Sequence, residues 1–254
     1  MTKHLGYLLL MVAIGCSSQP PVVPKPSNTS SASSSDTPVA KSAEKPQTDV
    51  SDDMSENAKP VVAAEPEPPF QLEDGFTLLS FSDFEAFGAE ATTWEGTADG
   101  IKCSGKPRGY LYSKQPYENF TWRLEYRFPR PDNLKDEAKF KGNTGFMIYI
   151  TGEHKIWPIS LEVQGKHVQM ASIKENGGAQ PVTATDDEAA RQKARRPVGQ
   201  WNAIEIVSKG GTLAVTLNGT PISTSEPDFL SEGAIGIQAE DHPFEVRRLR
   251  IRRD

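Results

Sequence analysis

The stretch Thr121–Phe128 alternates polar and apolar residues without a break, and this pattern limits the possible folds most strongly. Successive side chains of a strand point to opposite faces of a sheet, so a period of two predicts a strand with one buried face. A sheet with one apolar face needs a second layer to cover it. Four side chains of the stretch are expected in the core: Trp122, Leu124, Tyr126 and Phe128.

Six further segments alternate in the same way between turn signals; they are residues 145–150, 159–164, 203–207, 213–217, 234–239 and 244–252. The arginine-rich end, 247–253, predicts a basic edge strand that resists pairing with other sheets. One helix is predicted, beginning with the capping-box sequence Thr185–Glu188 and ending before Pro197. Many short strands with little helix predict an all-β fold, a two-sheet sandwich with one short helix.

The first 18 residues have the layout of a secretory signal. The apolar run Leu5–Ile14 is too short to span a membrane. It ends in small residues before Cys16, and this ending resembles the lipobox of bacterial lipoproteins, in which the cysteine is lipidated. We expect a signal peptide over residues 1–15, a lipid on Cys16 and a place in the cell envelope, on the outer membrane because Ser17 follows the cysteine. The alternative is an ordinary cleaved signal that contains a cysteine.

Residues 16–69 are expected to form a disordered tether, and residues 70–254 a single domain. The chain has no aromatic residue from 17 to 69 and carries half of its 20 prolines there, so this part cannot bury enough apolar surface to offset the entropy of ordering. Acidic and basic residues nearly balance in the domain, which argues against a nucleic-acid partner. Its one cysteine, Cys103, excludes an internal disulfide and zinc sites built from cysteine pairs.

Six short motifs follow one another in an order that resembles the 3-keto-disaccharide hydrolase domain family; they are Asn143–Phe146, Leu161–Gln164, Pro197–Asn202, Leu217–Gly219, Gly233–Gln238 and Phe244–Ile251. The resemblance covers nearly all of residues 70–254. It implies a jelly roll similar to concanavalin A-like glucanases and lectins, with a concave sheet that holds sugars, and it implies cleavage of 3-keto-glycosides. The chain departs from the family pattern at Thr144 and in the turn 239–242, which leaves a sugar-binding member without turnover as an alternative.

The alternation also indicates which polar side chains lie on the sheet face opposite the core. Glu162 and Gln164 are two residues apart, so both point away from the buried side of their strand. Amides and carboxylates bind sugar hydroxyls, and an aromatic ring stacks on a sugar's C–H face. The expected site comprises catalytic Glu162, Glu240 and His242, and sugar-binding Asn143, Tyr149, Trp157, Gln164 and Gln238. Arg123 and Glu125 would join this face if all strands shared one sheet, but a plain solvated face is favoured for them.

Two functions from different classes remain open. The first is an enzyme that cleaves a 3-keto-glycoside: the C3 carbonyl acidifies the C2 proton, Glu162 removes that proton, and Glu240 or His242 protonates the leaving oxygen on C1. The second is a non-catalytic lipoprotein that binds carbohydrate on the same face. No cofactor is expected, and no metal site is predicted because the histidines show no ligand spacing, although a metal requirement stays open. The expected partners are a carbohydrate and, through the lipid on Cys16, a membrane.

Overall fold

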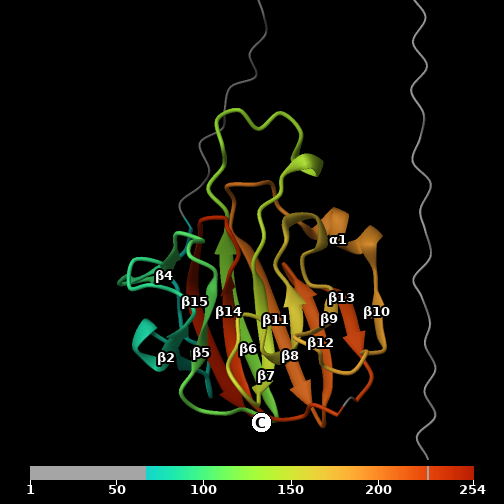
Figure 1. Cartoon of the computed structure of the whole chain (residues 1–254). Coiled ribbons are helices and arrows are strands. Elements are labelled where there is room, and N and C mark those ends of the chain that lie inside the picture. The colour runs from blue at the N-terminus through green and yellow to red at the C-terminus, as the bar shows by residue number, and fades with distance from the viewer. Residues whose placement is uncertain (1–66, 228) are drawn as a thin grey trace, which may run out of the picture. The chain divides into compact units, whose positions relative to one another are not determined.

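The structure, a computed structural model, describes residues 67–227 and 229–254. In this part of the chain, two antiparallel sheets face each other and one short α-helix lies at their upper end in the view of Figure 1. The expected signal peptide, Cys16 and the tether up to residue 66 lie outside the described residues. Among the described residues, no helix has the length and apolar character needed to cross a membrane.

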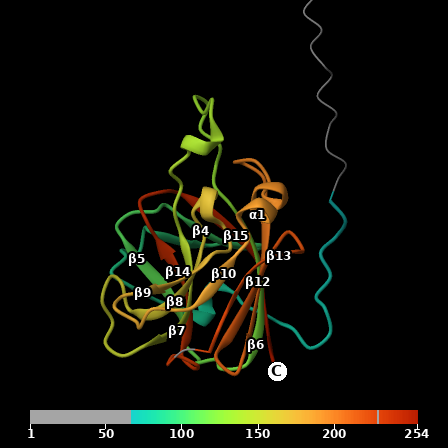
Figure 2. The same ribbon diagram turned by 90° about the vertical axis from the view of Figure 1, so that its right-hand side faces the viewer.

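Sheet A has the strand order β10-β13-β12-β11-β6-β15-β4-β3, and β1 pairs with β15 beside this path. Its strands, described from the N-terminus, are β1 (Thr77–Leu78), β3 (Trp94–Gly96), β4 (Gly100–Cys103), β6 (Phe120–Arg127), β10 (Ala184–Asp186), β11 (Asn202–Lys209), β12 (Thr212–Leu217), β13 (Thr220–Ser225) and β15 (Phe244–Arg253). Figure 2 shows β6 and β12 in the same layer of the domain, and β11 lies between them in the sheet.

Sheet B has the strand order β2-β5-β14-β7-β8-β9. Its strands are β2 (Phe84–Phe87), β5 (Gly109–Ser113), β7 (Gly145–Thr151), β8 (Ile159–Gln164), β9 (Ile173–Asn176) and β14 (Ala234–Ala239). The helices are the short 3₁₀ turns η1 (Phe81–Asp83), η2 (Glu137–Lys139) and η3 (His167–Gln169) and the α-helix α1 (Glu188–Ala194). The architecture confirms the predicted all-β sandwich of two sheets with one short helix.

The core fills the space between the two sheets. Trp122, Leu124, Tyr126 and Phe128 are each at most 2% exposed, which confirms the face predicted from the alternation of β6. The ring of Trp122 meets Phe146 of β7 edge to face, with centroids 6.0 Å apart, so β6 and β7 pack against each other across the sandwich. Burial of a large apolar side chain contributes about 1.5–3 kcal/mol, so these contacts are a main source of stability.

The turn Asn218–Gly219 joins β12 and β13 as the sequence predicts. Both residues have positive φ, 50° and 81°, which a two-residue type I′ hairpin turn requires. The Asn218 side chain accepts a hydrogen bond from the Ala203 N–H and donates one to the Ala194 carbonyl, each at 2.8 Å. The turn therefore also holds the end of α1 against sheet A.

The predicted capping box at Thr185–Glu188 is wrong by two residues. Residues 184–186 pair with β13 as strand β10, so the helix begins only at Glu188. The N-cap is Asp187, whose carboxylate accepts a hydrogen bond from the Ala190 N–H at 2.8 Å. Pairing with β13 uses the backbone that a capping box at Thr185 would need, and tertiary contact thus overrides the local signal.

The predicted basic edge strand at the C-terminus is also wrong, because β15 lies between β6 and β4 inside sheet A. Its arginines point outward, where they pair with glutamates of neighbouring segments. Phe244 of β15 is opposite Cys103 of β4, and the cysteine is 3% exposed. Burial raises the pKa of the Cys103 thiol to about 12, so the thiol stays protonated and packs as a core side chain.

Candidate functional site

The outer face of sheet B brings together the amide and carboxylate side chains of two strands. Glu162 of β8 and Gln238 of β14 lie on either side of Gly145, the first residue of β7, and the Gln238 Nε2 donates to Glu162 Oε2 at 3.3 Å. A methyl group at Gly145 would overlap the Oε1 atoms of both side chains. The glycine of the Asn143–Phe146 motif is therefore required for the close approach of this pair.

Glu162 is a carboxylate held almost entirely away from water. Its residue is 2% exposed, and its Oε1 accepts no hydrogen bond from any residue that the structure describes. The Lys174 Nζ lies 3.4 Å from this oxygen, an ion-pair distance without hydrogen-bond geometry. Burial raises the pKa of Glu162, and Lys174 and the hydrogen bond from Gln238 oppose that rise.

Glu240 is the second carboxyl group of the site and follows directly on β14. Its Oε2 accepts a hydrogen bond from the Asn143 Nδ2 at 2.7 Å. Burial, together with the negative charge of Glu162, raises the pKa of Glu240 to about 7, and the more distant Lys174 and Arg108 only partly offset this. Two carboxyl groups that repel each other in a poorly hydrated place hold a proton at neutral pH, which is a common property of acid–base sites.

Lys174 is a site residue that the sequence reasoning missed. It lies on β9 directly opposite Glu162, and its side chain is 48% exposed, so the ammonium group covers the buried carboxylate from the solvent side. The local signal was present, because buried Ile173 precedes Lys174 and fixes the lysine on the outer face. The partner of β9 could not be read from the sequence, because strand register is a tertiary property.

Three further residues of the expected site have different roles; they are Asn143, His242 and Gln164. The loop 128–144, which rises above the sheets in Figure 1, delivers Asn143 to Glu240. The His242 Nδ1 lies 3.1 Å from the Glu240 carbonyl oxygen, which can only accept a hydrogen bond, so Nδ1 carries a proton. Nε2 takes no part in this bond and can exchange a proton with a ligand. Gln164 is 3% exposed and its Oε1 accepts from the Lys166 N–H at 2.8 Å, so its carbonyl holds the turn after β8.

The expected position of Tyr149 on this face is wrong. The pairing of β7 with β8 shifts register between Ile148 and Thr151, and Tyr149 has a φ of 60°, so a bulge reverses the alternation. The Tyr149 side chain therefore points into the core, where its hydroxyl hydrogen-bonds Ser208 Oγ at 2.6 Å. Ile150 takes the outward position instead, packed with Met147 and Tyr110.

Trp157 and the pair Arg123 and Glu125 are not brought to the carboxyl groups. Trp157 is half-buried in the loop before β8, and no hydrogen bond or ring contact among the described residues joins it to Glu162. Arg123 and Glu125 lie on β6, which belongs to sheet A, so the condition that all these strands share one sheet fails. Both residues pair with charges on the outer face of sheet A, as the solvated-face interpretation expects.

An aromatic group that the sequence did not indicate lies on the same face, on the side of β14 that carries β5. The Tyr110 hydroxyl hydrogen-bonds the His154 Nδ1 at 2.6 Å, and the rings of His154 and Tyr112 have centroids 4.3 Å apart. The Tyr112 hydroxyl donates to Glu85 at 2.6 Å. Tyr110 is directly opposite Gln238, and the side chains of Met147 and Ile150 cover Gly236. Tyr110 is fully buried, so Tyr112 and His154 are the rings of this group that offer a surface for stacking.

The described residues contain no cluster of three or more His, Cys, Asp or Glu arranged to hold a metal ion. A cavity of about 940 Å³ lies on the outer face of sheet A and not at the carboxyl pair. The chemistry favours sheet B, because the Arg247 side chain hydrogen-bonds Glu67 in that cavity and lowers its pKa. A carboxylate held ionised in this way is a poor proton donor at neutral pH, whereas Glu240 is suited to proton exchange.

Solved structures with the same architecture include two proteins of low sequence identity. A protein of Parabacteroides distasonis described as a candidate glycosyl hydrolase is 18% identical with a TM-score of 0.51, over 70% of this chain and 93% of that one. The carbohydrate binding module CBM66 from Bacillus subtilis is 14% identical with a TM-score of 0.50, over 67% of this chain and 95% of that one. At such identities the likeness shows the fold alone, and it agrees with the two-sheet sandwich.

The sequence itself matches a family over most of its length. No curated protein matches the chain. The profile of the 3-keto-alpha-glucoside-1,2-lyase-like domain matches residues 74–252, nearly the whole of the sandwich, and confirms the resemblance drawn from the six motifs. The chain therefore belongs to the family of 3-keto-alpha-glucoside-1,2-lyase-like domains.

Proposed function

We propose that the domain binds a 3-keto-glycoside on the outer face of sheet B and eliminates the substituent on its C1 atom. The observation that carries this proposal is the pair Glu162 and Glu240, two carboxyl groups with raised pKa values in a place largely shielded from water. The family gives the reaction class, a 1,2-lyase, and the pair supplies the base and acid that such an elimination requires.

The reaction needs one proton removed and one proton delivered. The carbonyl at C3 acidifies the proton on C2, which Glu162 takes. The electron pair of that C–H bond forms the C1=C2 double bond while the C1–O bond breaks, and the leaving oxygen takes the proton held by Glu240. Once substrate has displaced it from Glu162, the Lys174 ammonium group is the nearby cation that can stabilise negative charge developing on the carbonyl oxygen. Addition of water to the double bond would complete a net hydrolysis.

The electrostatics distinguish the two carboxyl groups. Lys174 forms an ion pair with Glu162 and favours its ionised form, whereas the charge of Glu162 itself favours the protonated form of Glu240. Glu240, whose pKa is raised to about 7, is therefore the member of the pair that can exchange a proton near neutral pH. Glu162 is thus assigned as the base and Glu240 as the acid. His242 is the second candidate acid: in its doubly protonated form Nδ1 would keep its bond to the Glu240 carbonyl and Nε2 would carry the proton to be delivered.

A second function, sugar binding without turnover, is favoured by one observation. Lys174 covers Glu162, which is only 2% exposed, so substrate must displace the lysine side chain before the base can reach a C–H bond. A binding module would use the amides and the aromatic group of the same face without that movement.

We also propose that the protein is held at the membrane by a lipid on Cys16, and this part of the proposal rests on the sequence. The substitution Cys16→Ser should release the protein from membranes after a salt wash, and retention would contradict the anchor.

Incubation with two matched sugars separates the two functions. The purified chain is mixed with methyl 3-keto-α-glucoside and with methyl α-glucoside, and the products are followed by chromatography. Release of methanol from the keto sugar alone supports the lyase, because only that sugar has an acidified C2 proton. Cleavage of neither sugar together with measurable sugar affinity supports the binding module. Equal cleavage of both sugars would contradict the elimination mechanism.

A further inference from the structure

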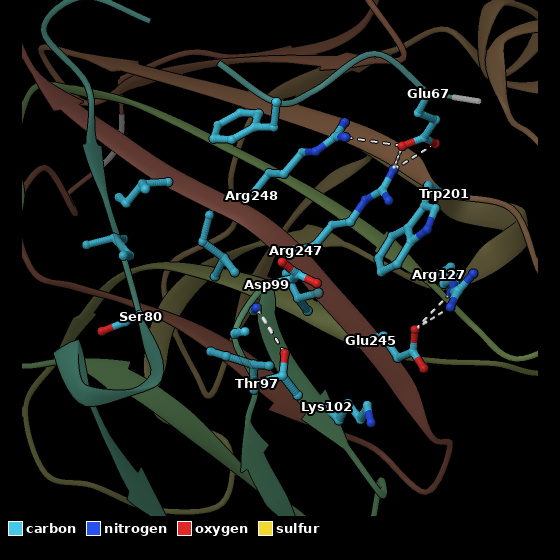
Figure 3. A pocket seen from close by; sticks show the side chains of 18 of the residues that line it. Glu67, Ser80, Thr97, Asp99, Lys102, Arg127, Trp201, Glu245, Arg247 and Arg248 are labelled. Carbon is cyan, nitrogen blue, oxygen red and sulfur yellow. Dashed lines mark hydrogen bonds and ion pairs between the residues drawn. The ribbon is translucent and has the colours of Figure 1, made fainter. Parts of the chain in front are cut away.

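The cavity on the outer face of sheet A is a groove between the sheet and the first described residues of the chain. It has a volume of about 940 Å³, within the range of pockets that hold ligands. Figure 3 shows Trp201 with Arg127 and Glu245 at one end, and Arg247, Arg248 and Glu67 along one side. The segment Glu67–Phe70 crosses it and supplies part of its lining.

A bulge in β15 places two consecutive arginines on the same side of sheet A. The pairing of β15 with β6 shifts register between Arg247 and Arg250, and Arg248 has a φ of 54°, a left-handed conformation that costs energy in a residue other than glycine. As a result both Arg247 and Arg248 hydrogen-bond the Glu125 side chain, at 2.8 and 2.9 Å. Strain of this kind is typical of a place that binds something.

The two arginines have more positive charge than sheet A neutralises. Glu125 is the one carboxylate of the sheet that pairs with them among the described residues, and Arg127 is paired with Glu245. The second carboxylate comes from Glu67, which Arg247 bonds at 2.6 and 2.9 Å and Arg248 at 3.1 Å. Asp99, whose carbonyl accepts a hydrogen bond from the Arg248 N–H at 3.4 Å, and Lys102 also line the groove and offset each other in charge. The groove thus has a place for one external carboxylate.

The neighbours of Glu67 fit the groove as an extended peptide. Pro68 and Pro69 line it, and such a proline pair is extended and semi-stiff, so little entropy is lost on docking. The Phe70 ring lies 5.4 Å from the Arg248 guanidinium and 5.2 Å from that of Arg250. In a segment made of a carboxylate, two prolines and an aromatic ring, the carboxylate and the ring therefore both contact arginines of the groove. The two prolines between them line its mouth.

We propose that this groove is a binding site for an acidic, proline-containing peptide segment, that residues 67–70 are its resident occupant, and that an external segment of the same chemistry displaces them. The inference is independent of the reaction on sheet B. A carboxylated sugar is the less suitable occupant, because the Arg127 and Arg247 guanidiniums already lie over the Trp201 ring at 4.4 and 4.2 Å, where a sugar would have to stack.

The test uses the full chain and a labelled peptide with the sequence of residues 64–71, Ala-Glu-Pro-Glu-Pro-Pro-Phe-Gln. Fluorescence anisotropy measures its dissociation constant for the unaltered chain and for Glu67→Ala. A tethered occupant competes at an effective concentration in the millimolar range, so its removal should tighten peptide binding at least about tenfold. Equal affinity for the two chains, or no binding to either, would overturn the proposal.

Two matched changes locate the contact. In the Glu67→Ala chain, Arg248→Gln should weaken the peptide about tenfold, whereas Arg252→Gln, which removes a half-exposed arginine of the same strand that pairs with Asp254, should leave affinity unchanged. A peptide with Gln at the position of Glu67 should also bind about tenfold more weakly than the original peptide to the chain that keeps Arg248. This comparison changes only the peptide, so it does not depend on whether a protein variant folds. Equal losses from Arg248→Gln and Arg252→Gln, or tighter binding of glucuronate than of the peptide, would contradict the assignment.

Discussion

The outer faces of both sheets carry glutamates, but their surroundings shift the pKa values of these glutamates in opposite directions. On sheet A, glutamates pair with arginines at the surface, and the hydrogen bond from Arg250 lowers the pKa of Glu73 to about 2. On sheet B, Glu162 is buried and Glu240 is half-buried, and the pKa values of both are raised. The arginines of the first face thus keep Glu73 ionised at neutral pH, whereas Glu240 on the second face can take up and release a proton there.

This difference shows why alternation alone is a weak guide to function. Both faces arise from the same period-two pattern, in which every second side chain points outward. What separates them is the partner of each carboxyl group: a guanidinium in the ion pairs of sheet A, and a second carboxyl, two amides and one ammonium in sheet B. Perturbed pKa values in a shielded place mark the face where chemistry is expected.

The largest effect is expected from Glu162→Gln. The change keeps the shape of the side chain and removes the base, so kcat for a 3-keto-glycoside should fall by about 10²–10⁴-fold while the melting temperature stays close to that of the unaltered chain. The matched control is Glu205→Gln on sheet A, which loses its ion pair with Arg123 and should keep full activity. Activity retained in Glu162→Gln would assign the base to another residue and remove the contrast between the faces.

A smaller loss of kcat is expected from Gly145→Ala, which forces the Glu162 and Gln238 side chains apart without altering a charge. The added methyl group overlaps the Glu162 and Gln238 side-chain oxygens, so these side chains must move. We expect kcat to fall at least about tenfold and unfolding free energy to fall by about 1–3 kcal/mol, the usual cost of overpacking. Unchanged kinetics would show that the spacing of the two side chains is unimportant for the reaction.

The dependence of stability on pH should have opposite signs on the two faces, and the change should be larger for sheet B. Glu240 binds its proton more tightly in the folded chain, so stability is lost as the pH rises from the ordinary value of 4.5 towards about 7. Urea unfolding at pH 5 and pH 8 should show a loss of about 1–3 kcal/mol that is clearly smaller in Glu240→Gln, where Glu162 is the remaining carboxyl of the pair with a raised pKa. The same loss in both proteins would place the titration elsewhere.

The smallest effect is the change in unfolding free energy expected from Glu73→Gln, next to sheet A. Glu73 has a pKa lowered to about 2, so the stability it contributes is present above 4.5 and is lost as the pH falls through about 2. Its side chain is 39% exposed, and solvent screening limits the effect of Glu73→Gln at pH 7 to under about 1 kcal/mol. The difference between the two proteins should disappear in unfolding curves near pH 2. A difference that grows towards low pH would reverse the assignment.

The sequence predicted the layers of the fold and much of the carboxyl site because both depend on a local period. The alternation of β8 placed Glu162 outward, and that of β14 placed Gln238 on the same side, as the structure has them. The pattern failed at Tyr149, where a bulge reverses the faces of β7. A bulge adds one residue to one strand, and no residue type at this point announces it.

The rest of the site depends on which strands are neighbours, and a local pattern does not contain that information. Lys174 reaches Glu162 only because β9 pairs with β8, and the aromatic group with Tyr110 and Tyr112 joins the face only because β5 pairs with β14. The same limit explains why β15, rich in arginine, was expected at an edge although it lies inside sheet A.

The central claim is that burial and the charge of Glu162 together raise the pKa of Glu240 on the outer face of sheet B. Carbon-13 NMR of the side-chain carboxyl groups, followed from pH 3 to pH 9, measures the pKa of Glu240 in the unaltered chain and in Glu162→Gln. We expect a pKa of about 7 in the unaltered chain and a clearly lower value in the variant, because the neighbouring negative charge is gone. A Glu240 that titrates near 4.5 in both proteins would contradict the account.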